Sequence, residues 1–112
     1  MDGRQLEILG SLFRTAWPDE GASSHELNAI TRWMEVRGVP LAERVALTEA
    51  CLGHSDPEMR LEDEQSRQDA LELLVGQGFD HEELLQELAE RLAIGPDDLE
   101  MLRLRAHKES SP

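Results

Sequence analysis

The stretch WPDEGASSHELNAITRWMEV, residues 17–36, holds the densest turn chemistry in the chain. Pro18 ends a helix there, because a proline ring pushes the preceding residue out of the α region. Ser24 is a suitable N-cap, and Glu26 lies in the first turn, where the positive end of the helix dipole favours a carboxylate. Apolar side chains then recur at helical spacing as far as Met34. The stretch therefore predicts a helix end, an acidic loop and a second helix.

On both sides of this stretch the chain alternates between apolar helical stripes and short polar breaks. Helices are expected over residues 4–17, after an N-cap at Ser24, from Pro40, over 64–75, after a capping box of Asp80 and Glu83, and over 96–106. The predicted fold class is all-α, a compact bundle of five to seven helices. We expect one domain, residues 1–107, and a disordered tail, residues 108–112, because 112 residues leave room for a single core.

A faint repeat relates the two ends of the sequence. Ser24–Glu26 and Asp80–Glu82 both read polar residue, His, Glu, and both open helices. Pro40 and Pro96 open the helices that follow, and each pair is separated by 56 positions (24 to 80, 40 to 96). Two related three-helix halves would produce this pattern, although common capping preferences would also produce it.

Acidic residues dominate the composition, with 24 Asp and Glu against 11 Lys and Arg, for a net charge of −13. Such a chain repels nucleic acid and anionic membranes, so the favoured partners are basic proteins and cations. No run approaches ~18 apolar residues, and the N-terminus lacks a secretory pattern. With one cysteine, Cys51, there is no internal disulfide, and we expect a cytoplasmic protein. A leucine-rich face would also suit a homodimer.

The sequence carries no enzyme signature, since it has neither a glycine-rich phosphate loop nor a nucleophile elbow. Cys51 lies among apolar residues late in a predicted helix, which favours a buried structural thiol over a nucleophile. Trp17 and Trp33 flank apolar stripes. Core positions, with each indole N–H turned to the rim, are favoured for them over stacking on a ligand. We therefore predict a non-enzymatic protein.

Candidate metal ligands gather at two loop-to-helix junctions. The residues are Asp19, Glu20, His25 and Glu26 in the first junction and Asp80, His81, Glu82 and Glu83 in the second. Ca²⁺ and Mg²⁺ take several carboxylate oxygens, and the two histidines are potential ligands of a transition metal. The same residue types also occur at helix N-termini for capping and dipole reasons alone, and EF-hand spacing is absent.

A third acidic segment lies between the predicted third and fourth helices. Its carboxylates are a candidate docking surface for a basic protein, formed by Glu58, Glu62, Asp63 and Glu64. The corresponding function is an acidic adaptor or decoy. A solvated face or a flexible connection is the ordinary interpretation of such a charge run, and it is favoured over a docking surface.

Two segments resemble tellurite-resistance TerB-like domains. Residues 16–27, AWPDEGASSHEL, resemble the acid–glycine loop of that family and its Glu-led helix. Residues 82–99, EELLQELAERLAIGPDDL, resemble its final helix pair. The resemblance covers about residues 5–106 and implies an all-helical, stress-associated interaction module.

The family's acidic loops are linked to metal, so the resemblance also implies a divalent cation such as Ca²⁺ or Mg²⁺. Its ligands here would be Asp19, Glu26 and Glu83. Two departures bear on this site. Glu20 splits the usual Asp-Gly pair, and residues 76–80, GQGFD, lack the Ala-Asp-Gly core. The leading expectation is a non-enzymatic interaction module that responds to a divalent cation.

Overall fold

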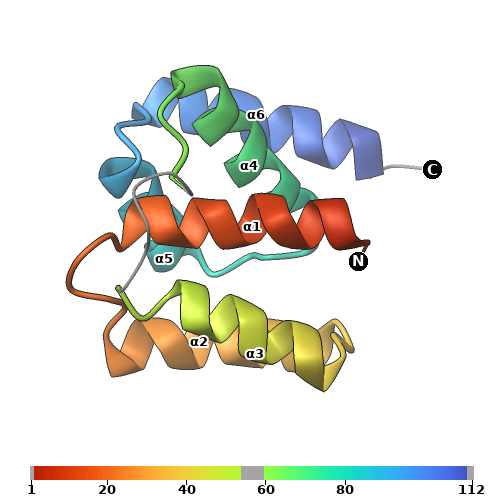
Figure 1. Cartoon of the computed structure of the whole chain (residues 1–112). Helices are drawn as coiled ribbons and strands as arrows, with labels where there is room; N and C mark the ends of the chain where they lie inside the picture. Colours follow the sequence, from red (N-terminus) through yellow and green to blue (C-terminus); the bar gives the residue numbers. More distant parts are fainter. Residues whose placement is uncertain (1, 54–59, 111–112) are drawn as a thin grey trace.

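The apolar stripes fold as helices throughout the computed structural model, which describes residues 2–53 and 60–110, with side chains described as far as residue 107. All regular elements of the described residues are α-helices, so the all-α prediction is confirmed (Figure 1). Their bounds are α1 Gly3–Ala16, α2 Ser24–Val36, α3 Leu41–Ala50, α4 Glu64–Gly76, α5 Glu82–Arg91 and α6 Pro96–Ser110.

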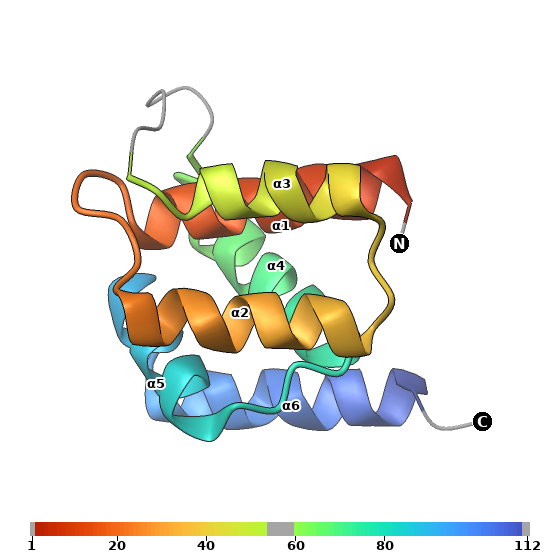
Figure 2. The same ribbon diagram turned by 90° about the horizontal axis from the view of Figure 1, so that it is seen from below.

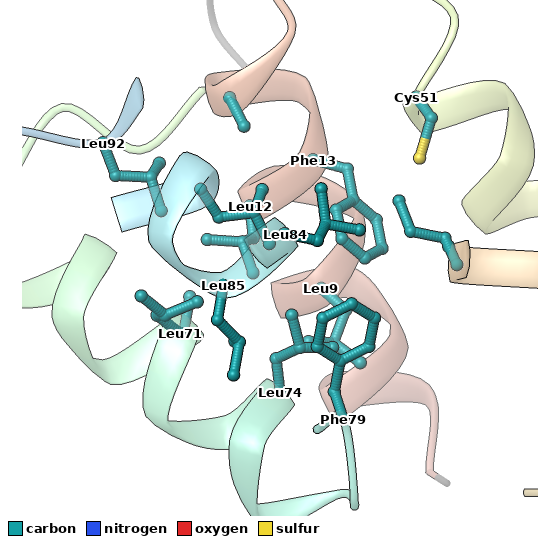
Figure 3. Close-up of a cluster of buried hydrophobic side chains, with 14 of the residues drawn as sticks. Leu9, Leu12, Phe13, Cys51, Leu71, Leu74, Phe79, Leu84, Leu85 and Leu92 are labelled. Atoms are coloured by element: carbon teal, nitrogen blue, oxygen red, sulfur yellow. The ribbon is translucent and has the colours of Figure 1, made fainter. Parts of the chain in front are cut away.

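The helix α1 lies between two layers, with α2 and α3 on one side and α4 and α6 on the other (Figure 1). Its helical spacing places Leu9, Leu12 and Phe13 on buried positions. Figure 3 shows these three side chains packed among leucines of α4 and α5. Because α1 contacts α3, α4 and α5, its apolar side chains form the centre of the core.

The two halves of the chain, α1–α3 and α4–α6, share one packing pattern. In each half the first helix packs against the third, and the second also contacts the third. The halves are joined by contacts of α1 with α4 and with α5. This is the arrangement that two related three-helix halves would have.

Four helices, α1, α2, α3 and α5, begin one residue away from their expected starts, and for α2 and α5 the N-cap explains the shift. The N-cap of α2 is Ser23, not Ser24, because only Ser23 lies three residues before Glu26 and can complete a capping box with it. The N-cap of α5 is His81, not Asp80, and its Nδ1 accepts a hydrogen bond from the Leu84 N–H at 3.2 Å. In both cases the side chain that satisfies the first-turn amides sets the start of the helix.

The outer helices differ from expectation in two further respects. The helix α6 continues to Ser110, into the segment for which we expect a disordered tail. The apolar residues of α3 are divided, since Leu47 and Cys51 are buried whereas Leu41 and Val45 are exposed. No helix of the described residues has both the length and the apolar character needed to cross a membrane.

Candidate functional site at the junction of the halves

The N-terminal turns of α2 and α5 meet at a small pocket of about 60 Å³. We call it the junction pocket, and it is lined by His25, Glu26, Ala29, His81, Glu83, Leu84 and Glu87. The imidazole rings of the two histidines lie edge to face, with their centroids 6.1 Å apart. The positions that the sequence repeat relates, 25 and 81, therefore lie side by side.

Glu26 is the most deeply buried charged residue of this pocket, with 7% of its surface exposed. Its Oε1 accepts a hydrogen bond from the Ser23 N–H at 2.7 Å, which completes the capping box of α2. Its Oε2 is buried and receives no hydrogen bond from an N–H or hydroxyl donor. A buried carboxylate oxygen without a donor is costly, so this atom needs a proton or a cation beside it.

Glu87, on α5, lines the same pocket, and each of the two carboxyls shifts the pKa of the other. Its hydrogen bond to Glu26 raises the pKa of Glu87, burial and the negative charge of Glu26 add to this, and Arg91 opposes it. Burial alone would raise the pKa of Glu26, but the hydrogen bonds from Glu87 and Ser23, with the charge of Arg91, lower it. The pKa values of these two neighbouring carboxyls thus shift in opposite directions, as expected for a coupled pair of acids.

The predicted cation ligands are only partly brought together. Glu26 and Glu83 line the junction pocket. Asp19 is exposed in the loop before α2, and its Oδ1 lies 4.0 Å from a guanidinium nitrogen of Arg60. Among the described residues, no group of three or more His, Cys, Asp and Glu side chains is arranged to hold a metal ion. The divalent-cation site therefore stays a prediction.

Glu87 lies four residues before Arg91 in the sequence, a spacing that favours an ion pair on the surface of a helix. That pair is present, with a nitrogen–oxygen distance of 3.4 Å. The contact of Glu87 with Glu26 joins helices far apart in the sequence and was not foreseen. The available signal was its position one turn after Glu83, which places both on the same face of α5.

Three of the four predicted docking residues lie at the start of α4. Glu58 is outside the described residues, whereas Glu62 and Glu64 are exposed. Asp63 caps α4, because its Oδ2 accepts hydrogen bonds from the Ser66 N–H at 3.1 Å and the Ser66 hydroxyl at 3.2 Å. One of the candidate docking carboxylates thus has a structural role.

This segment is attached to the end of α1. The Leu61 N–H donates to Thr15 Oγ1 at 2.7 Å, and Arg60 reaches Asp19. The loop after α1 and the start of α4 consequently lie on the same side of the molecule (Figures 1 and 2). We call this the acidic side; its exposed carboxylates are Asp19, Glu20, Glu62, Asp63 and Glu64.

The cysteine and one tryptophan behave as predicted. Cys51 is fully buried, and burial raises the pKa of its thiol to about 12. The Trp33 indole N–H donates to the Gln77 carbonyl oxygen at 3.1 Å. The rim prediction is wrong for Trp17, whose indole nitrogen is buried without a hydrogen-bond partner. Its ring instead lies 5.8 Å from the Arg91 guanidinium carbon, at cation–π range.

Comparison with known proteins gave no match to a family model, to a curated protein or to a solved structure.

Proposed function

We propose that the protein is a non-enzymatic helical interaction module that binds a basic protein partner. The observation that carries this proposal is the acidic side, where two segments distant in sequence present exposed carboxylates together. With a net charge of −13 in the chain, such a surface attracts cationic proteins and accelerates their association. The TerB-like assignment belongs to this proposal and rests on the loop and helix-pair residues quoted above.

The backbone around the acidic side is closely packed, which supports its use as a docking surface. The Ala22 N–H donates to the Cys51 carbonyl oxygen at 2.7 Å, so the loop before α2 is attached to the end of α3. A surface held in this way loses less conformational entropy on binding than a flexible charge run.

The test is capture of protein partners from a cell extract by the full chain, with elution at NaCl concentrations from about 0.05 to 0.5 M. We expect basic partners that elute early in the gradient. The double variant Glu62→Gln with Glu64→Gln should capture less of the same partners. The control Glu35→Gln with Glu100→Gln makes the same charge change at exposed positions elsewhere and should bind normally. Partners whose capture is insensitive to salt and to both variants would overturn the proposal.

The second candidate function is a response to Ca²⁺ or Mg²⁺ at the junction pocket. It is favoured by the buried Glu26 Oε2, which has no N–H or hydroxyl donor and shares a pocket with Glu83 and Glu87. A cation there would relieve carboxylate repulsion between α2 and α5.

This candidate is tested by thermal unfolding with and without millimolar Ca²⁺ or Mg²⁺. We expect the melting temperature to rise with metal, because a ligand of the folded state stabilises it. Glu26→Gln should remove the rise, whereas Asp19→Asn, outside the pocket, should leave it. A melting curve of the unmutated protein that does not change with metal would end this idea. If Asp19→Asn removes the metal-dependent rise in melting temperature and Glu26→Gln does not, the cation binds at the loop before α2 instead.

A further inference from the structure

The helix α3 has apolar side chains on two opposite sides, but only one of these sides is covered. Leu47, Ala50 and Cys51 face the core and are buried. We call the opposite side the outer face of α3; it comprises Leu41, Ala42, Val45, Ala46 and Leu52, the last just beyond the end of the helix. The three large side chains of this face, Leu41, Val45 and Leu52, are exposed to 67%, 49% and 46%. A helix that is apolar on both sides is ordinarily buried on both.

The outer face has no cover within the described structure. The helix α3 packs on α1 and α2, and in Figure 2 it lies in front of α1. None of the ion pairs formed by the described residues involves α3. By contrast, the exposed apolar residues of α6, Met101 and Leu104, lie beside two ion pairs. Arg103 pairs with Glu82 at 2.7 Å and Arg105 with Glu72 at 2.8 Å.

The charge around the outer face selects the kind of partner. The exposed Glu49 lies within the face, and Leu52 adjoins the loop that carries Asp19 and Glu20. A second copy of the chain would bring another net charge of −13 against this negative surface. A cationic partner gains attraction where a second copy meets repulsion.

We propose that the outer face of α3 docks an amphipathic helix of a partner protein, apolar on one face and flanked by Lys or Arg. The ten residues of α3 extend about 15 Å, which matches about three turns of such a helix. The partner would place apolar residues, at spacings of three and four, on Leu41, Val45 and Leu52. Its basic residues would then lie over Glu49 and the adjacent acidic side. This inference rests on the proposed function, because it specifies the basic partner.

The test uses a synthetic helical peptide with leucines on one face and lysines on the other, titrated into the full chain by calorimetry. We expect binding, and we expect Val45→Glu to weaken it roughly ten-fold or more, since it places a carboxylate at an apolar anchor. The matched control is Leu104→Glu, which adds the same charge to the exposed apolar pair of α6. Charge alone would strengthen the binding of a basic peptide to both variants, so a loss confined to Val45→Glu identifies the face.

The outcomes separate this inference from the proposed function. If both variants bind the peptide equally well, the proposal of a basic partner is retained, and the assignment of its binding site to the outer face of α3 is wrong. If the peptide does not bind at all, the basic partner itself is in error. Sedimentation of the unmutated protein as a dimer that Val45→Glu converts to a monomer would assign the face to a second copy and overturn the inference. Circular dichroism verifies that each variant is folded.

Discussion

The halves α1–α3 and α4–α6 pack alike, but the N-terminus of the second helix is capped differently in each half. In the first half Ser23 and Glu26 form a reciprocal capping box, and Glu26 is buried between the halves. In the second half His81 caps α5 alone, and Glu83 remains exposed. The same packing pattern is therefore compatible with two kinds of N-cap for the free amides of the first turn, a reciprocal capping box and a single side-chain hydrogen bond. Only the first of these caps brings a buried carboxylate to the junction pocket.

The third helices differ more. Two ion pairs connect α6 to α4 and α5, through Arg105 with Glu72 and Arg103 with Glu82. The Arg103 pair also lowers the pKa of Glu82. No ion pair of the described residues connects α3, whose outer face is apolar. The third helix of the second half is thus attached by ion pairs to both other helices of that half, whereas the third helix of the first half has an apolar outer face and no such pair.

The largest expected effect concerns the glycines that connect these helices. Gly53, after α3, has φ +82°, and a Cβ there would overlap the Gly21 amide and lie 2.8 Å from the Asp19 carbonyl oxygen. Gly78, after α4, has φ +87°, but its nearest neighbour is the flexible Arg37 side chain at 3.6 Å. Gly53→Ala should lower the free energy of unfolding by about 3 kcal/mol or more, and Gly78→Ala should lower it by about 1–2 kcal/mol. Urea unfolding measures both, and equal costs would contradict the close loop contact in the first half.

The second prediction concerns Cys51, which is buried beside that contact. Because burial raises the pKa of its thiol to about 12, the native protein should resist a thiol reagent at pH 8 and react after unfolding. Cys51→Ser should lower the free energy of unfolding by about 1–3 kcal/mol, since a hydroxyl would be buried there. Rapid labelling of the folded protein would contradict this environment. A control with denatured protein establishes the full labelling rate.

The third prediction compares the two caps directly. Ser23→Ala should cost about 1 kcal/mol, because it removes the bond to the Glu26 amide and loosens the capping box. His81→Ala should cost less, about 0.5 kcal/mol, because His81 contributes a single cap bond. Chemical denaturation of both variants measures the difference. If His81→Ala lowers the free energy of unfolding more than Ser23→Ala does, the predicted ranking of the two caps is wrong.

The smallest effect concerns the opposite pKa shifts of Glu26 and Glu87. The raised pKa of Glu87 contributes stability that is complete below its unfolded pKa and is lost as the pH rises through its folded pKa. The lowered pKa of Glu26 contributes stability that is present above its unfolded pKa and is lost as the pH falls through its folded pKa.

Glu87→Gln replaces the titrating donor with an amide that donates at every pH. Its stability relative to the unmutated protein should therefore rise from pH 4 to pH 8, by less than about 1 kcal/mol because Glu87 is partly exposed. The variant also loses the ion pair with Arg91, which reduces the gain at neutral pH. A stability difference that falls as the pH rises would contradict the raised pKa of Glu87.

Helix periodicity and turn chemistry are local properties, and they were sufficient for the all-α fold. The breaks at Pro18 and Gly76–Gly78 and the start of α4 at Glu64 agree with the spacing of apolar residues. The exact caps were not predicted, because Ser23 and Ser24 are equivalent as residue types. Only the hydrogen bond of Glu26 back to Ser23 distinguishes them. Cys51 was correctly expected to be buried from its apolar neighbours in sequence.

By itself, the sequence determined which segments become helices, and it determined the strong negative charge. Both follow from residue type and spacing along one chain. Tertiary structure alone decided that Glu26 meets Glu87, that Asp19 stays outside the junction pocket and that Val45 faces outward. The reason is that contacts between α2 and α5, and the choice of which apolar side of α3 faces α1, depend on packing between helices. Periodicity within one helix does not encode that packing.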